Sequence, residues 1–139
     1  MGDACLPNLL PLDVAVAVIQ RDGRFLIAQR LPNDSFGGYW EFPGGKLVSG
    51  ETLQGGLARE ILEELGVRVE VGSKRMVIEH NYPGRTIRLH CFECWLLEGE
   101  PRAIECTEWR WVVAAELDRF QFPPASQPLI KNLQADDGL

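Results

Sequence analysis

A single long helical pattern lies between two β-hairpin patterns in this chain. The apolar residues Leu57, Ile61 and Leu65 recur at intervals of four, which is the spacing of one face of a helix. Gly66 follows directly and is a typical helix stop. We therefore expect a helix over residues 52–65, with strands before and after it in the chain.

The two hairpin patterns each consist of apolar runs joined by turn residues. Residues 13–30 form two runs that meet at Asp22-Gly23, a strong signal for a hairpin turn. Residues 75–97 repeat the pattern around Tyr82-Pro83-Gly84-Arg85. Each segment is predicted to form a pair of antiparallel strands.

Two shorter elements follow the second hairpin. Residues 109–113 have the composition of a further strand. In residues 128–134, Leu129, Ile130 and Leu133 stand at helical spacing and predict a short C-terminal helix. Residues 1–11 and 135–139 are expected to be flexible ends.

Length and charge limit the possible functions. The chain has 139 residues, of which 45% are hydrophobic, so we expect one domain over residues 1–139. Its 20 acidic and 14 basic residues give a formal net charge of -6, which would repel the phosphates of DNA or RNA. We expect no polymeric nucleic acid as a partner. A small phosphorylated molecule stays possible, because divalent metals bridge carboxylates to phosphate oxygens.

The sequence favours a cytoplasmic location. The longest apolar run, from Val14 to Ile19, is far shorter than a membrane span. The first residues, MGDACLP, lack the basic start of a secretory signal. We expect no contact with a membrane.

The four cysteines, Cys5, Cys91, Cys94 and Cys106, raise the question of a disulfide or a zinc site. Cys91 and Cys94 lie in an apolar, aromatic run typical of a strand, where side chains three apart point to opposite faces. Because no second CxxC or pair of nearby histidines completes a tetrahedral site, we expect ordinary half-buried thiols.

A glycine-rich segment, EFPGGKLVSGE, precedes the predicted helix at residues 41–51. Proline followed by two glycines fits neither a helix interior nor a central strand, so residues 43–45 are predicted to form a turn or loop. A backbone without side chains can come close to a bound group.

Three glutamates crowd one face of the predicted helix. Glu60, Glu63 and Glu64 stand at positions i, i+3 and i+4, where like charges repel by about 0.2–0.5 kcal/mol per pair. One interpretation is a solvated acidic face. The other is a set of hard oxygen ligands for a divalent metal, which would offset the repulsion. The glycine-rich segment and the further acid Glu51 favour the metal site.

Residues 45–67 resemble the Nudix box. The box consists of Gly, five residues, Glu, seven residues, Arg-Glu, an aliphatic residue, any residue, Glu-Glu, any residue, Gly and an aliphatic residue, and this chain matches every defined position. The stretches Glu41-Phe42-Pro43-Gly44-Gly45-Lys46 and Phe122-Pro123-Pro124-Ala125 are also similar to the MutT branch of the family. The resemblance implies an α+β Nudix fold, an α/β/α sandwich with a mixed sheet between helices.

The same resemblance implies a divalent metal cofactor, Mg²⁺ or also Mn²⁺. The implied ligands are the carbonyl of Gly44 and the side chains of Glu60, Glu63, Glu64 and Glu105. Glu105 lies in the segment after the second hairpin, where the MutT pattern has a further metal-associated glutamate. A solvated surface glutamate is the alternative for this position.

Catalytic roles follow from the resemblance in the same way. Glu51 would help to fix the carboxylate cluster, and Arg59 would pair with carboxylates and orient them. The proton acceptor is left open between Glu60 and Glu105, and Glu64 completes the implied catalytic set.

The implied substrate is a nucleoside triphosphate. Arg30 and Lys46 would face its phosphates, and the alternative for both is a solubilising surface charge. The other implied substrate-binding residues are Phe42, Arg85 and Ser126. Attack of water on the β-phosphorus would release a nucleoside monophosphate and pyrophosphate, and in the MutT branch the base is an oxidised guanine. We expect the protein to act as a monomer.

One position departs from the MutT pattern. Ser126 stands where the pattern has an asparagine, whose amide contacts the edge of the oxidised base. A hydroxyl cannot replace both hydrogen bonds of an amide, so base selectivity is open. A serine before Gln127-Pro128 is also a typical helix N-cap.

Three functions are therefore compared. The first is a MutT-like hydrolase of 8-oxo-dGTP or a related oxidised purine nucleotide, which would cleanse the nucleotide pool. The second is a hydrolase of CTP or 5-methyl-dCTP. The third is a Nudix domain that only binds a nucleotide, which is disfavoured because every carboxylate of the box is present.

Overall fold

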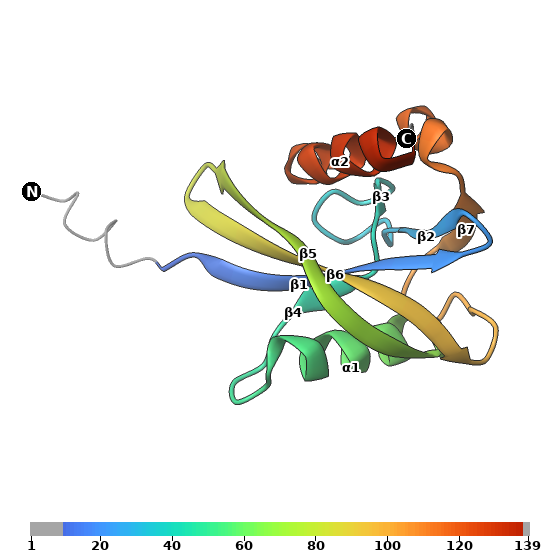
Figure 1. Ribbon diagram of the computed structural model, residues 1–139. Helices are drawn as coiled ribbons and strands as arrows, with labels where there is room; N and C mark the ends of the chain where they lie inside the picture. The colour runs from blue at the N-terminus through green and yellow to red at the C-terminus, as the bar shows by residue number, and fades with distance from the viewer. Residues whose placement is uncertain (1–9, 138–139) are drawn as a thin grey trace, which may run out of the picture.

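The computed structural model describes residues 10–137, which form seven strands, two α-helices and two 3₁₀ helices (Figure 1). The strands are β1 (Leu12–Arg21), β2 (Arg24–Gln29), β3 (Trp40–Glu41), β4 (Gly44–Lys46), β5 (Arg68–Tyr82), β6 (Arg85–Glu98) and β7 (Glu108–Val112). The helices are α1 (Leu53–Leu65), η2 (Ala114–Arg119), η3 (Pro124–Ser126) and α2 (Gln127–Asp137).

The strands form one mixed sheet with β1 near its centre. The strand order is β3-β2-β1-β6-β5, while β4 pairs with β1 and β7 pairs with β2. Strands β1 and β6 run parallel, with Val14 opposite Leu89, and the other pairs are antiparallel. The predicted hairpins at Asp22-Gly23 and at Pro83-Gly84 are confirmed.

The two α-helices cover opposite faces of the sheet (Figure 1). Leu129, Ile130 and Leu133 of α2 belong to one hydrophobic core. Leu57, Ile61 and Leu65 of α1 belong to the other, where burial of each side chain contributes about 1.5–3 kcal/mol. Residues 15–19 of β1 are all buried because alternate side chains enter the two cores. The predicted α/β/α sandwich is confirmed.

The second hairpin is longer than its sequence pattern. Strand β5 begins at Arg68, seven residues before the predicted start at Arg75. Its pairing with β6 is shifted between Val71 and Lys74 and again between Lys74 and Met76. Each irregularity interrupts the alternation of faces, so the first part of the strand lacks a clear period of two.

Helix α1 ends at Gly66 as its sequence predicts, and Thr52, which we expected to be its first residue, is instead its N-cap. The hydroxyl of Thr52 accepts a hydrogen bond from the N–H of Gly55 (3.0 Å), and Gly66 adopts φ 69° and donates to the carbonyl of Leu62 (2.9 Å). Gly56 packs closely against this loop, since a Cβ there would lie 2.4 Å from Cδ2 of Leu47, whose side chain would have to move. The helix thus holds the preceding loop against its first turn.

The C-terminal helix extends beyond its predicted end. We expected residues 135–139 to be flexible, but α2 continues to Asp137, so the expectation is wrong for residues 135–137. Arg75, in the central part of β5, forms a hydrogen bond with Asn132 (2.6 Å) and an ion pair with Asp136, which holds this last turn. Residues 1–9 and 138–139, the remainder of the expected flexible ends apart from residues 10–11, lie outside the described part of the chain.

The expected N-cap at Ser126 is not formed. Helix η3 ends at Ser126 and α2 begins at the next residue, so helical turns run through the position where a cap would interrupt them. Within residues 10–137 the Ser126 hydroxyl has no helix N–H as a hydrogen-bond partner. The side chain therefore stays available for another contact.

The cysteines in the described part of the chain are buried more deeply than expected. Cys91 enters the α2 core, and Cys94 and Cys106 enter the α1 core, so the expectation of half-buried thiols is wrong for these three. Burial raises the pKa of Cys91 and of Cys94 to about 12. Cys5 lies outside the described residues. Neither α-helix within residues 10–137 has the length and hydrophobicity of a membrane-spanning helix.

Candidate functional site

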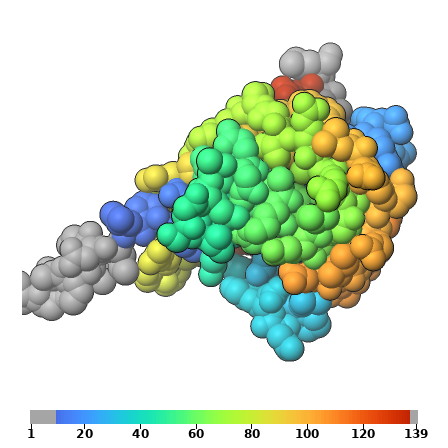
Figure 2. Space-filling model, turned by 90° about the horizontal axis from the view of Figure 1, so that it is seen from below, coloured from blue at the N-terminus to red at the C-terminus, as the bar shows by residue number. Residues whose placement is uncertain are grey.

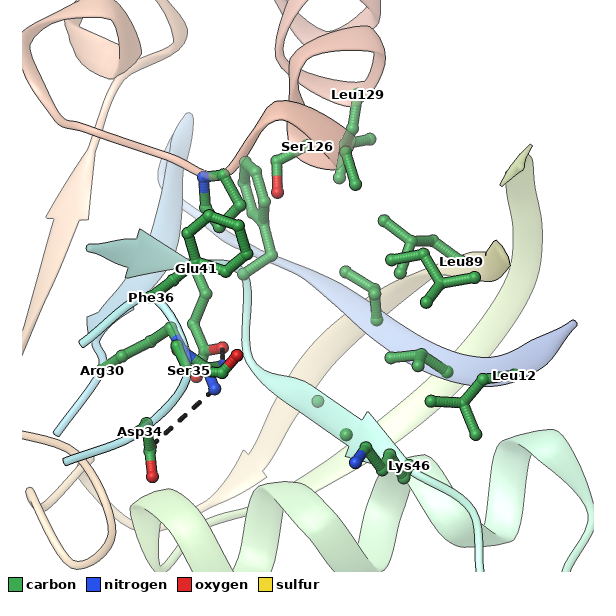
Figure 3. A pocket seen from close by; sticks show the side chains of 18 of the residues that line it. Leu12, Arg30, Asp34, Ser35, Phe36, Glu41, Lys46, Leu89, Ser126 and Leu129 are labelled. Carbon is green, nitrogen blue, oxygen red and sulfur yellow. Dashed lines mark hydrogen bonds and ion pairs between the residues drawn. The ribbon is translucent and has the colours of Figure 1, made fainter. Parts of the chain in front are cut away.

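A cavity of about 600 Å³ opens between the sheet, the β2–β3 loop and η3 (Figure 3). Arg30, Asp34, Glu41, Lys46 and Glu64 provide charged groups at one end, next to α1. The wall formed by β1, β6 and α2 is apolar. Its lining residues are Leu12, Val14, Val16, Ile87, Leu89 and Leu129.

The charged end is organised by Arg30 at the end of β2. Its guanidinium donates to Oε1 of Glu41 (2.5 Å) and to the carbonyl of Ser35 (2.6 Å), and lies 4.0 Å from the carboxylate of Asp34. Arg30 therefore ties the β2–β3 loop to the edge of the cavity, as the dashed line in Figure 3 indicates for Asp34.

The two glycines of the loop before α1 lie where side chains would collide. Gly44 has φ 150°, and a Cβ there would lie 2.1 Å from the carbonyl oxygen of Ala15. A Cβ on Gly45 would lie 2.5 Å from Oε1 of Glu60. Strand β4 thus approaches both the sheet and α1 as closely as a backbone can. This close approach is what the Pro-Gly-Gly sequence permits.

Arg59 connects the carboxylates of the Nudix-like segment. It donates to both oxygens of Glu51 (2.5 and 3.0 Å) and lies 3.1 Å from Glu63 and 3.2 Å from Glu60. These hydrogen bonds lower the pKa of Glu51 to about 2. The ion pairs expected for Arg59 are therefore present, and they fix the direction of three carboxylates.

Glu64 is the most deeply buried acid of the site. The residue is 8% exposed, and its Oε1 has no hydrogen-bond partner among the described residues. Burial, with the adjacent carboxyl of Glu41, raises the pKa of Glu64, and burial likewise raises the pKa of Glu41. A buried carboxylate pair of this kind requires a shared proton or a bound cation.

The loop that contains Glu105 caps the end of α1. The N–H groups of Ile104 and Glu105 donate to the carbonyl of Glu64 (3.2 and 3.1 Å), and that of Arg102 donates to the carbonyl of Leu65 (2.8 Å). In Figure 2 this orange segment lies against the green end of α1. Burial raises the pKa of Glu60, and the charges of Glu63 and Glu105 add to this rise.

These residues fit a divalent cation, although their side chains do not yet converge. Within residues 10–137, no three acidic, histidine or cysteine side chains already surround one point. The reason is that Arg59 holds Glu60 and Glu63. The unpartnered Oε1 of Glu64 and the closely approaching backbone of Gly44 supply the oxygen donors that Mg²⁺ prefers.

The predicted substrate-binding residues are only partly brought together. Arg30, Phe42, Lys46 and Ser126 line the cavity, and the ring of Phe42 stacks on Phe122 with centroids 5.2 Å apart. In Figure 3 the hydroxyl of Ser126 points into the cavity. Arg85 is exposed at the start of β6 and does not line this space.

Glu41 and Tyr82 are among the lining residues that the sequence analysis did not identify as site residues. Glu41 lies beside Glu64, and its position between Trp40 and Phe42 was an available signal, because an acid in an apolar run is seldom left without a partner. Tyr82 lines the cavity from the end of β5. Its position in a turn sequence offered no such signal.

The raised pKa of Glu64 predicts how the metal-free protein responds to pH. The folded state holds this proton more tightly than the unfolded state, so the stabilisation is complete below about pH 4.5 and is lost as the pH rises towards the folded-state pKa. Glu64→Gln should therefore be more stable than the wild type at pH 8, by about 1–3 kcal/mol, with a smaller difference at pH 5.

Urea unfolding in the presence of a chelator measures this difference. Magnesium should stabilise the wild type at pH 8 and have much less effect on the variant. Identical pH dependence of the two proteins would show that Glu64 is not under electrostatic strain.

The chain is similar in sequence and in structure to known proteins. The sequence model of the NUDIX domain matches residues 14–132. A CTP pyrophosphohydrolase of Escherichia coli is 34% identical over 124 residues, covering 89% of this chain and 92% of that protein. A putative 8-oxo-dGTP diphosphatase 2 of Mycobacterium tuberculosis is 39% identical over 123 residues, covering 86% of each. The solution structure of the E. coli ORF135 protein superimposes with a TM-score of 0.80 at 32% identity, covering 94% of this chain and 93% of that one.

Proposed function

Because this chain belongs to the Nudix family, we propose that it is a metal-dependent pyrophosphohydrolase of nucleoside triphosphates, with an oxidised purine nucleotide such as 8-oxo-dGTP as its substrate. Nudix hydrolases generally use divalent metal ions, and Mg²⁺ is the proposed ion here, with Mn²⁺ as a substitute. The products are a nucleoside monophosphate and pyrophosphate.

The cavity with two chemically different ends is the observation that carries this proposal. Its charged end combines Arg30 and Lys46 with the carboxylate of Glu64, and the wall formed by β1, β6 and α2 is apolar. A nucleotide has the same division, because its phosphates are charged and its base has two apolar faces. Phe42, stacked on Phe122, is a flat surface against which a base can pack.

The residues at and beside the charged end have three roles, which are metal binding, phosphate binding and positioning of the carboxylates. Glu60, Glu63, Glu64, Glu105 and the Gly44 carbonyl would hold the metal, which when bound neutralises phosphate charge and lowers the pKa of water. Arg30 and Lys46 bind phosphate oxygens, and Arg59 keeps the carboxylates in position.

A carboxylate oxygen of Glu60 or Glu105 takes the proton of the attacking water. The water oxygen forms a bond to the β-phosphorus, and the bond between that phosphorus and the oxygen bridging to the α-phosphate breaks. Glu60 is favoured by its partial burial, which raises its pKa and makes the carboxylate a better proton acceptor. Glu105 is more exposed.

A cytidine nucleotide is the second candidate substrate. The similarity to a CTP pyrophosphohydrolase supports it, and so does the serine at position 126, where the MutT pattern has asparagine. A panel of 8-oxo-dGTP, dGTP, CTP, 5-methyl-dCTP and dATP, with identification of the products, tests both. Release of pyrophosphate from none of them in the presence of magnesium would contradict the proposal.

The variant Ser126→Asn tests the choice of base. If the pocket accepts oxidised guanine, an amide that can both donate and accept should raise the preference for 8-oxo-dGTP over dGTP about tenfold in kcat/KM. Steady-state assays with the two nucleotides measure this ratio, with a melting curve as control. An unchanged ratio, with both nucleotides poor substrates, would favour the cytidine nucleotide.

A further inference from the structure

Tyr82, at the end of β5, joins three segments that are distant in the sequence. Its ring contacts Phe36 of the β2–β3 loop, with centroids 5.6 Å apart, and packs against His80 at 4.5 Å. Its hydroxyl oxygen accepts a hydrogen bond from the backbone N–H of Ala125 in η3 (3.1 Å). All three of Phe36, Tyr82 and Ala125 line the cavity.

The hydrogen bond fixes which role the hydroxyl of Tyr82 can play. In η3, the N–H of Ser126 donates to the carbonyl of Pro123 (3.0 Å), and the N–H of Ala125, one residue earlier, is the donor that Tyr82 satisfies. Since the oxygen of Tyr82 is already an acceptor, its own proton remains to be donated. No acceptor within residues 10–137 takes this proton.

The cavity wall on the side of η3 is mostly apolar. The part of the cavity wall contributed by β6, η3 and α2 consists of Ile87, Leu89, Ala125 and Leu129, apart from Ser126. The next residue after the one that Tyr82 contacts is Ser126, whose hydroxyl points into the cavity (Figure 3). Tyr82 and Ser126 thus bring hydroxyl-bearing side chains to this part of the cavity lining.

We propose that Tyr82 determines base specificity together with Ser126, by donating a hydrogen bond to a carbonyl oxygen on the edge of the base. This inference rests on the proposed function, because it assumes that the apolar end holds the base. A hydroxyl whose oxygen is occupied by Ala125 favours a base oxygen and disfavours an amino group at the same place. Guanine, 8-oxoguanine and cytosine carry such oxygens, and adenine carries none.

Binding of nucleoside monophosphates tests the proposal without requiring catalysis. Calorimetric titration of 8-oxo-dGMP, dCMP and dAMP into the wild type and Tyr82→Phe measures base recognition in the absence of turnover. The variant keeps the ring and its contacts with Phe36 and His80 and removes only the oxygen. Affinity for the best-bound carbonyl-bearing nucleotide should fall about tenfold, with a change below about twofold for dAMP.

Tyr39→Phe is the matched control, because Tyr39 also packs on Phe36, with centroids 5.3 Å apart, but does not line the cavity. It should leave all three affinities unchanged. An equal loss for the three nucleotides in Tyr82→Phe would show that Tyr82 only tethers η3, and would overturn the proposal. An unchanged affinity, or no discrimination against dAMP by the wild type, would overturn it as well.

The same experiments separate this inference from the proposed function. If the wild type fails to hydrolyse any nucleoside triphosphate but discriminates among the monophosphates through Tyr82, the proposed reaction is wrong and the base recognition stands. If hydrolysis occurs and Tyr82→Phe retains full selectivity in both assays, the reaction stands and the role of Tyr82 is wrong.

Discussion

Glu64→Gln is expected to reduce turnover of the preferred nucleotide to background, a loss on the order of 10⁴-fold or more, while the protein stays folded. The Oε1 atom of Glu64 is buried without a partner, and an amide keeps the shape of the side chain but removes the negative charge that a hard cation requires. Glu60→Gln should have a similar effect, because the carboxylate of Glu60 lies against the backbone of Gly45, next to the proposed metal ligand Gly44. A Cβ on Gly45 would be only 2.5 Å from Oε1 of Glu60.

Steady-state assays over a magnesium titration provide the measurement, and a melting curve in chelator tests the fold. Glu98→Gln is a suitable control, because Glu98 is exposed on β6 and lies 3.8 Å from Arg68, outside the site. Full turnover by Glu64→Gln or Glu60→Gln at saturating magnesium would exclude that residue as a metal ligand.

Glu105→Gln is expected to lower kcat by about 10²–10³-fold, less than Glu64→Gln. The backbone of Glu105 is held by its hydrogen bond to the Glu64 carbonyl (3.1 Å), so the substitution changes the side chain without releasing the loop. Its exposed carboxylate raises the pKa of Glu60 only as a minor contribution after burial, which indicates a supporting role.

The pH dependence of kcat between pH 6 and 9 distinguishes the possible roles of Glu105. A change in the shape of the profile in the variant would indicate that Glu105 takes part in proton transfer, and a uniformly lower profile would indicate a role in holding the metal. Glu100→Gln in the same connection is the control, since Glu100 pairs with Arg21 (3.3 Å). A variant equal to the wild type across this range would leave Glu105 as a solvated residue.

The secondary structure was predictable wherever local chemistry dominates. Asp22-Gly23 favours a tight turn by its own backbone preferences, and Thr52 and Gly66 cap α1 through contacts within a few residues. The failures have longer-range causes. The start of β5 is obscured by bulges that exist only in pairing with β6, and the last turn of α2 is held by Arg75 from another strand.

Some residues of the candidate site were likewise predictable from local spacing, whereas others depend on tertiary packing. Glu60, Glu63 and Glu64 were visible as neighbours because a helix brings positions i, i+3 and i+4 together. The site role of Glu105 was inferred from resemblance and stays a prediction, while the structure shows that its backbone is held at the end of α1. Glu41 was missed, because it lies beside Glu64 only when α1 packs on the sheet that contains β3.

The sequence by itself determined the hairpin turns, the end of α1 at Gly66, the acidic face of α1 and the glycines that let β4 approach it, because each depends on residues close together in the chain. Only the tertiary structure decided that Glu64 is buried beside Glu41, that Arg85 lies away from the cavity, and that Tyr82 meets Ala125. These contacts join segments up to 43 residues apart. Such contacts form only when the sheet and both hydrophobic cores are packed together. Because that packing involves the whole chain, no local sequence pattern predicts these contacts.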